Sequence, residues 1–276
     1  MCPKEKDEWT AQKVEDGEWY LVEPTAVESS YEMFNMCTEH LNKEEFRAGK
    51  KCLKRLLDIS STNIEALNYL ATIYEGEGKR GRATDMWAKA VDIGRNALPA
   101  DFKEGDEIPW GFTENRPFLR ALQCLGLAYL ESGNMDKALS IFEENLSYNP
   151  NDNQGIRDLL AKVYLDKGRL ADVIQLREMF SDDAMPATSY GNALALFKKG
   201  EKEKATEELG KAVEDLPKVA EELLKDEHEE PERIMQGTVS FGGWDQAYDH
   251  WEMFGEYWGE EELGWLEDVL NEVKGE

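Results

Sequence analysis

The sequence has no long apolar run and no apolar leader, and each absence excludes a class of protein. No stretch of about 18 consecutive apolar residues occurs, so no membrane-spanning helix is predicted. The amino terminus, MCPKEKDEWT, has no apolar centre of the kind that secretory signals contain. We therefore expect a cytoplasmic protein that makes no contact with a membrane.

Cysteine is scarce as well. Cys2, Cys37, Cys52 and Cys124 are the only four in 276 residues, which is too few for a disulfide framework, so we expect reduced and mostly buried thiols. The stretch Cys37-x-x-His40 could join Cys52 in a zinc site. A structural zinc usually takes four ligands in two close-spaced pairs, and no second pair exists. No metal site is predicted.

Positive charge is in short supply. The chain has 32 Lys and Arg against 58 Asp and Glu, a formal net charge of −26. Binding to phosphate backbones depends on neutralisation by Lys and Arg, so nucleic acid is not expected as a partner. A protein or peptide partner is expected to be basic or apolar rather than acidic. The alternative is that the charge serves solubility alone.

Motifs of catalysis are also missing. The sequence contains no G-x-S-x-G, no Walker-type loop, no G-x-G-x-x-G after a strand and no H-E-x-x-H. Its three histidines, His40, His228 and His250, are far apart along the chain, which disfavours a general-base constellation. We expect a non-enzyme without a cofactor.

The sequence does contain an internal repeat. Residues 125–150 align with residues 192–217 at an offset of 67, close to two units of about 34 residues. The matched pairs are Ala128 with Ala195, Gly133 with Gly200, Ala138 with Ala205, Phe142 with Leu209 and Pro150 with Pro217. Small residues let two antiparallel helices approach closely, glycine ends the first helix, and proline stops the second.

In these features the chain resembles tetratricopeptide repeat (TPR) proteins. The best copy, residues 119–152, has Leu122, Leu125, Gly126, Tyr129, Ala138, Phe142 and Pro150 in the family's places. Other copies are placed near 30–63, 64–97, 154–187 and 186–219. The resemblance implies an all-α fold, a right-handed α-solenoid of antiparallel helix pairs, with about five repeats and a C-terminal helical cap.

The predicted organisation has five parts. They are an N-terminal extension (1–29), repeats 1–2 (30–97), a loop rich in Pro, Gly and aromatics (98–118), repeats 3–5 (119–219), and an acidic connection with aromatic capping helices (220–276). The extension is expected to be either flexible or folded over the first helix. The charged run 225–233 is expected to be a solvated connection.

The polar stretch NPNDNQGIRDLL, residues 149–160, resembles a calcium loop at first sight. A calcium loop needs Gly at position 6 and Glu at position 12, and neither register of this stretch supplies them. Pro150 can end one helix, and Asn151, Asp152 or Asn153 can cap the next. We interpret the stretch as a turn.

Two aromatic segments leave alternatives open. In the loop 98–118, Trp110 and Phe112 either pack over a helix edge or contact a partner. Near the C-terminus, five aromatic side chains form either a cap on the last repeat or an exposed docking surface. These five are Trp244, Tyr248, Trp251, Trp258 and Trp265, with Asp245, Asp249, Glu252 and Glu256 expected on the outer face.

The TPR resemblance also implies a function: a concave groove, lined by the first helix of each pair, that binds a protein or peptide. The candidate contact residues are Asn68, Thr72, Trp110, Phe112, Gln123, Leu127, Glu131, Arg157 and Lys162. Because Gln123 and Leu127 stand where a chaperone-tail clamp would place Asn and Lys, that clamp is not predicted. We expect a scaffold or adaptor. The alternatives are an acidic assembly chaperone for a basic client, or an accessory subunit of an enzyme complex.

A second resemblance concerns three stretches: ENRPFLRAL, NPNDNQGIRDLL and GGWDQAYDHWEMF. Together they are similar to a variant group of helical-repeat proteins from prokaryotes. That similarity implies no activity.

Overall fold

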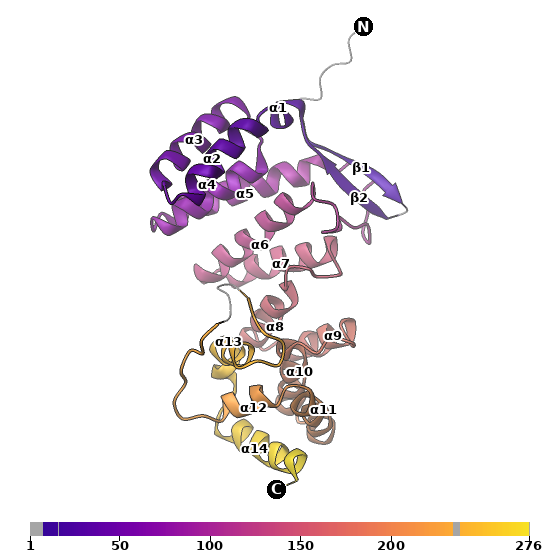
Figure 1. Ribbon diagram of the computed structural model, residues 1–276. Coiled ribbons are helices and arrows are strands. Elements are labelled where there is room, and N and C mark those ends of the chain that lie inside the picture. The colour runs from indigo at the N-terminus through magenta and orange to yellow at the C-terminus, as the bar shows by residue number, and fades with distance from the viewer. Residues whose placement is uncertain (1–7, 16, 234–237, 276) are drawn as a thin grey trace. The chain divides into compact units, whose positions relative to one another are not determined.

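The computed structural model describes residues 8–15, 17–233 and 238–275. The fold is all-α, a TPR-like α-solenoid whose helices form successive antiparallel pairs (Figure 1). The chain divides into unit 1 (Met1–Ile156) and unit 2 (Arg157–Glu276). Residues 1–7 of the predicted extension, which include Cys2, and residues 234–237 of the predicted connection lie outside the described residues.

Unit 1 contains three helix pairs, preceded by the short helix α1 (Thr25–Glu28). The pairs are α2 (Tyr31–Asn42) with α3 (Phe46–Ile59), α4 (Ile64–Gly76) with α5 (Arg80–Ala97), and α6 (Arg116–Glu131) with α7 (Met135–Tyr148). Asn63 caps α4, since its side chain accepts a hydrogen bond from the Ala66 amide at 2.8 Å. Helix α6 begins inside the predicted loop, because Pro117 at the start of its first turn is compatible with a helix.

The predicted small residues lie where the paired helices meet. Ala71, Ala83 and Ala138 are completely or almost completely buried. Gly126 on α6 lies so close to α7 that an added Cβ atom would be 2.3 Å from the Phe142 ring. Glycine is therefore required at position 126 for close approach, which agrees with the predicted repeat register.

The N-terminal extension contains a β-hairpin that was not predicted. Strand β1 (Thr10–Glu15) pairs antiparallel with β2 (Glu18–Val22). The hairpin is held by the 98–118 loop: the Trp19 amide donates to the Glu107 carbonyl at 2.9 Å, and the Trp19 indole donates to Asp106 at 2.9 Å. The buried Asn115 side chain accepts from the Leu21 amide and donates to the Trp19 carbonyl. The loop thus provides the polar partners that the hairpin needs.

The expectation of reduced thiols is wrong for two of the four cysteines. Cys37 on α2 and Cys52 on α3 form a disulfide. The antiparallel packing of α2 on α3 places their Cα atoms 5.2 Å apart, a separation that a disulfide readily spans. Cys124 is a free, half-buried thiol, and partial burial raises its pKa to about 11. It is therefore protonated at neutral pH.

Unit 2 contains the remaining helices. They are α8 (Ile156–Asp166, whose first residue closes unit 1), α9 (Leu170–Met179), α10 (Pro186–Lys198), α11 (Lys202–Asp215), α12 (Pro217–Leu223), α13 (Trp244–Phe254), the 3-10 helix η1 (Gly255–Tyr257) and α14 (Glu260–Lys274). The core of this unit forms around Tyr190 and Leu209, with Ala247 of α13 and Leu266 of α14 packed into it.

The turn interpretation of residues 149–160 is confirmed. The Asp152 carboxylate accepts a hydrogen bond from the Ile156 amide at 2.6 Å, at the start of α8. The buried Asn149 side chain accepts from the Trp110 amide at 3.2 Å. The amide-rich sequence therefore caps a helix and anchors the preceding loop.

The C-terminal aromatics pack mainly as a cap on the last repeat. Trp258 is buried, and Trp265 stacks on Phe197 of α10 with ring centroids 4.3 Å apart. Trp244 is the exception, at 38% exposed. The expected outer face is wrong at Asp245, which is buried because its carboxylate accepts from the Ser240 amide at 2.7 Å.

The charged run 225–233 is irregular and mostly exposed, and His228 is its main point of contact with the cap. The His228 ring stacks on Trp251 with centroids 3.6 Å apart and contacts the buried Glu222 carboxylate at 3.0 Å. Lys225 also pairs with Glu222. Lys225 and His228 thus provide the polar partners that the buried Glu222 carboxylate requires.

Two features are absent from the described part of the chain. None of its helices is long and apolar enough to cross a membrane. Nor does it gather three or more His, Cys, Asp or Glu side chains in a way that could hold a metal ion.

Candidate protein-binding surface

The first helices of unit 1 carry the accessible members of the predicted set. Thr72 on α4 and Glu131 on α6 are exposed, and Leu127 on α6 is half-buried. Tyr69, one residue after Asn68 on α4, is 38% exposed and makes an edge-on contact with Phe34 of α2, with centroids 5.5 Å apart. We call Tyr69, Thr72, Leu127 and Glu131 the first-helix face.

Two predicted contact residues on these helices make hydrogen bonds to other parts of the chain. Asn68 is buried, and its side chain donates to the Pro117 carbonyl at 2.8 Å, joining α4 to α6. Gln123 exchanges hydrogen bonds with Gln154, donating to its carbonyl at 3.2 Å and accepting from its side chain at 3.0 Å. Both side chains therefore hold neighbouring parts of unit 1 together.

Trp110 and Phe112 in the loop are half-buried. The guanidinium carbon of Arg116 lies 5.4 Å from the Trp110 ring centroid, and the Phe112 ring lies 5.8 Å from that of Tyr20. These contacts agree with the packing alternative for the loop. The part of each ring that remains accessible is open to a partner as well.

Arg157 and Lys162 belong to unit 2 and are engaged there. Arg157 pairs with Asp183 at 2.8 Å, and both side chains are mostly buried. Lys162 pairs with Glu256, and its ammonium also donates a hydrogen bond to the Tyr257 hydroxyl at 2.9 Å. The nine predicted residues therefore do not form one site within either unit.

Carboxylates crowd one end of the first-helix face. Partial burial and then the charge of Glu131 raise the pKa of Glu75, and the charge of Arg80 opposes the shift without cancelling it. Arg80 approaches Glu131 at 4.0 Å, through side chains that are both mostly exposed. A single solvent-exposed Arg offsets little of this negative charge. This end of the face therefore favours a cation.

A second group of carboxylates lies where β2 leads into α1. Burial, followed by the charges of Glu114, Glu28 and Glu65, raises the pKa of Glu23 to about 7. The Tyr31 hydroxyl donates to Glu23. Because the charged form is disfavoured in the folded protein, Glu23 contributes a cost to folding at neutral pH.

Glu23→Gln is therefore expected to raise the free energy of unfolding at pH 8 by about 1–3 kcal/mol. Since the folded-state pKa is raised, the folded protein holds the proton between about pH 4.5 and 7, and wild-type stability falls as pH rises through that window. Urea unfolding at pH 4 and pH 8 measures the difference. The matched control is Glu32→Gln, at an exposed position on α2. Equal effects of the two variants at both pH values would contradict the expectation.

Comparison with known proteins places the chain in a family. The model of the Tcf25 family, described as "Transcriptional repressor TCF25", matches residues 31–274. The chain belongs to this family. All three stretches that resemble a variant helical-repeat group lie inside the matched range. No curated protein matches the chain.

Solved structures similar to this Tcf25-family chain are TPR proteins, which confirms the predicted fold. YrrB, described as a TPR protein with an unusual peptide-binding site, is 18% identical with a TM-score of 0.50, covering 70% of this chain and 91% of YrrB. MamA is 19% identical with a TM-score of 0.51, covering 70% of this chain and 95% of MamA. A TPR protein from Parabacteroides merdae ATCC 43184 is 16% identical with a TM-score of 0.50, covering 90% and 80%.

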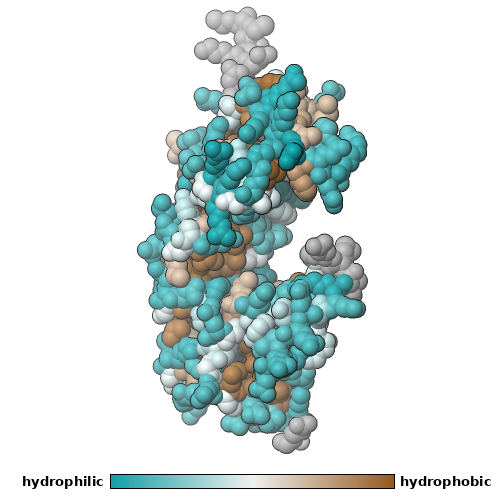
Figure 2. All heavy atoms as spheres, turned by 90° about the vertical axis from the view of Figure 1, so that its left-hand side faces the viewer, coloured by the Kyte–Doolittle hydropathy of each residue, from teal (hydrophilic) through white to brown (hydrophobic). Residues whose placement is uncertain are grey.

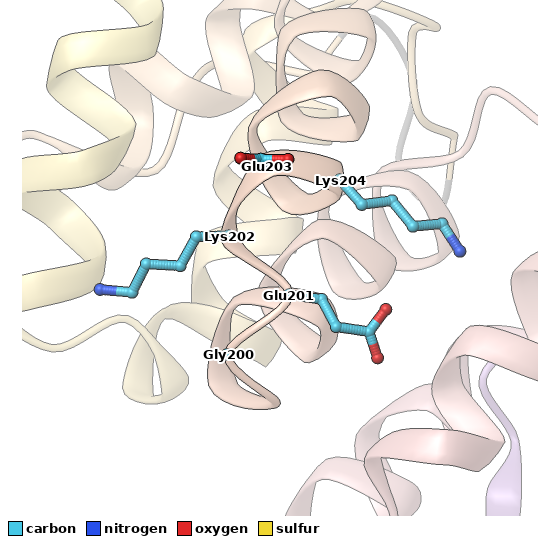
Figure 3. Close-up of a pocket in the computed structure, with 5 residues that line it drawn as sticks. All are labelled: Gly200, Glu201, Lys202, Glu203 and Lys204. Carbon is cyan, nitrogen blue, oxygen red and sulfur yellow. The ribbon is translucent and has the colours of Figure 1, made fainter.

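A surface depression in unit 2 of the Tcf25-family chain does not have the features of a site. It lies at the turn between α10 and α11 and is lined by residues 200–204. Figure 3 shows Lys202 and Lys204 pointing to opposite sides of the chain. Lys202 pairs with Glu261 at 3.1 Å. The cations therefore do not converge on a common ligand.

Sequence reasoning missed Tyr69, Glu75 and Glu23. Tyr69 has a readable signal, because it precedes the predicted Thr72 by three residues and therefore lies on the same side of α4. Glu75 and Glu23 have no such signal in a chain with 58 acidic residues. Their importance comes from neighbours that only the fold brings close.

Proposed function

We propose that this protein is a non-catalytic scaffold or adaptor, and that its first-helix face binds a partner segment that is both basic and apolar. The observation that carries the proposal is the combination, on one set of helices, of an exposed aromatic at Tyr69 with the mutually repelling carboxylates Glu75 and Glu131. The ring and Leu127 offer apolar contact, and the carboxylates attract a cation.

Charge over the whole chain supports the same partner chemistry. The net charge of −26 favours encounter with basic segments. Hydrophilic residues cover most of the face drawn in Figure 2, with smaller hydrophobic patches between them. The YrrB description, a TPR protein with a peptide-binding site, supports the mode of binding by analogy alone.

The family description adds a setting for this activity. A transcriptional repressor can act on DNA or on other proteins. A chain with 58 acidic and 32 basic residues is poorly suited to contact phosphates. We infer that any repressing role of this chain is exercised through a protein partner.

A panel of labelled peptides of equal length tests the proposal: one alternating Lys and Leu, one Ser and Leu, and one Glu and Leu. The Lys–Leu peptide is expected to bind tightest and the Glu–Leu peptide not at all. Thr72→Arg is expected to weaken binding of the Lys–Leu peptide about tenfold, because the added positive charge on the face repels the lysines of the peptide. Thr84→Arg on α5 is the matched control, since both hydroxyls donate to the carbonyl four residues earlier. Equal weakening by the two variants would refute the assignment to this face.

Salt separates the scaffold from its main alternative, an acidic chaperone for a basic client. Binding that rests on charge alone falls steeply between about 0.05 M and 0.5 M salt, whereas apolar contact at Tyr69 and Leu127 persists. The proposal predicts a partial loss of binding over this range of salt concentration. Complete loss by 0.5 M salt would favour the chaperone.

A further inference from the structure

Unit 2 contains a polar pocket of about 410 Å³ where α10 packs between α9 and α11. Ile174, Arg177 and Glu178 line it from α9, Asn192 lines it from α10, and Lys204 lines it from α11. A volume of this size lies in the range of pockets that hold small molecules. The pocket is separate from the first-helix face, which belongs to unit 1.

Asn192 is the unusual residue of this lining. In the alignment of the repeats it falls on Leu125, a core residue of unit 1 that is 2% exposed. Asn192 is 4% exposed, and its side-chain amide makes no hydrogen bond to any residue that the structure describes. Buried polar groups are almost always paired, and an unpaired amide in place of a core leucine costs stability. A ligand that binds the amide would account for this exception.

The Asn192 amide is also accessible to a ligand. It lines the pocket, and it is not among the buried polar atoms that are both unpaired and closed to solvent. Both ring nitrogens of His250, by contrast, are unpaired and closed to solvent. Asn192 is therefore an unpaired buried group that an incoming molecule can reach.

Two positively charged side chains of the pocket are already engaged. Lys211 pairs with Glu207 and Glu208, each at 2.8 Å. The Arg177 guanidinium donates to two backbone carbonyls in the segment 180–183. Carbonyls fix the position of the guanidinium without neutralising it, so its positive charge still acts on the pocket.

Glu178 and Lys204 remain available. Both are exposed, and neither makes an ion pair with any residue in the described part of the chain. Figure 3 shows Lys204 pointing away from Lys202, the lysine that pairs with Glu261. The pocket thus offers an unpaired cation, an unpaired carboxylate and an unpaired amide.

This set of groups defines the ligand that fits. A simple carboxylate would be repelled by Glu178, and a simple amine would be repelled by Lys204 and Arg177, whereas a zwitterion satisfies both signs. We propose that this pocket binds a free amino acid with an aliphatic side chain, such as leucine. The ligand carboxylate accepts from the Asn192 amide and from Lys204. The ligand ammonium donates to Glu178, and the aliphatic side chain contacts Ile174. This site is additional to the proposed first-helix face and does not depend on it.

Four small molecules of related shape test the proposal by isothermal titration of the full chain. They are L-leucine, 4-methylpentanoate, which lacks the ammonium, 3-methylbutylamine, which lacks the carboxylate, and N-acetyl-leucine amide, which mimics a leucine within a peptide. Leucine is expected to bind roughly tenfold or more tightly than each of the others, because each lacks a charge-assisted hydrogen bond. Absence of leucine binding at millimolar concentration would overturn the proposal. Equal binding of N-acetyl-leucine amide would overturn it as well, in favour of a peptide segment.

Two variants locate the binding in this pocket. Asn192→Leu introduces the residue that the aligned repeat has at Leu125, so it is expected to fold and to weaken leucine binding about tenfold or more. Asn271→Leu, at an exposed position on α14, is the matched control and is expected to keep the wild-type affinity.

Glu178→Gln removes only the expected partner of the ammonium, at an exposed position where the fold is not at risk. It is expected to bind leucine and 4-methylpentanoate with nearly equal affinity, and this test stands even if Asn192→Leu does not fold. Unchanged leucine affinity in folded Asn192→Leu, or an unchanged preference for leucine in Glu178→Gln, would each overturn the assignment.

Discussion

Gly126→Ala is expected to lower the free energy of unfolding of unit 1 by about 1–3 kcal/mol. The added methyl group would lie 2.3 Å from the Phe142 ring, closer than any real contact allows. Phe142 is completely buried and has no room to retreat. Relief therefore requires α6 and α7 to separate, with loss of packing along the whole pair. Urea unfolding of the full chain, followed by a probe in unit 1, measures the effect.

The same substitution at Gly210 on α11 is the matched control. Apart from its chain neighbours and its own helix backbone, no heavy atom lies within 4 Å of the position that its Cβ would occupy. Alanine is the better helix former by up to about 1 kcal/mol, so Gly210→Ala is expected to be neutral or stabilising. Changes of opposite sign in the free energy of unfolding at positions 126 and 210 would support the close crossing of α6 and α7. A neutral Gly126→Ala would contradict the assigned repeat register.

The stability of wild type relative to His250→Phe is expected to fall as the pH is lowered from 6.5. Burial lowers the folded-state pKa of His250 from 6.5 to about 3, so between these values the unfolded chain binds a proton that the folded chain does not. This proton uptake lowers the free energy of unfolding of wild type, relative to that of His250→Phe, by about 1.4 kcal/mol per pH unit. The loss reaches about 2 kcal/mol at pH 5. Titration of carboxylates is common to both proteins and largely cancels.

At neutral pH His250→Phe is expected to be at least as stable as wild type, because an unpaired buried polar group costs about 1–3 kcal/mol. Thermal unfolding of both proteins at pH 5 and pH 8 measures the two effects together. His40→Phe, whose side chain is 40% exposed, is the control for loss of a histidine. A pH-independent difference between wild type and His250→Phe would mean that His250 is not buried as a neutral ring.

The repeat could be predicted from sequence because it rests on local spacing. Ala138 recurs as Ala205 and Phe142 aligns with Leu209 at one fixed interval, and such intervals translate directly into faces of a helix. The turn at Asp152 could be predicted for the same reason, since a helix cap is a local device.

The hairpin and the disulfide depend on residues that the fold brings together. Strand β2 is held by Glu107 and Asn115, which lie more than 80 residues further along the chain. The disulfide depends on the packing of α2 against α3, which places Cys37 beside Cys52. Spacing along the sequence does not reveal that β2 lies beside the 98–118 loop, or that Cys37 lies beside Cys52.

The candidate surface was predictable only in part, for a similar reason. Thr72 and Glu131 are exposed as the repeat pattern implies. Asn68 lies one helical turn before Thr72 on α4, yet its side-chain amide donates a hydrogen bond to the Pro117 carbonyl. These two residues are 49 positions apart in the sequence. A repeat pattern gives the direction of a side chain, and the contacts across helices decide whether it is free to bind.

Site-specific photocrosslinking tests the central claim most directly. A photoreactive amino acid placed at position 72 is expected to crosslink the Lys–Leu peptide, and the same residue at position 84 is not. Unlabelled peptide in excess should abolish the product. Crosslinking at position 84 in preference to position 72, or at neither position while the peptide remains bound, would contradict binding on the first-helix face.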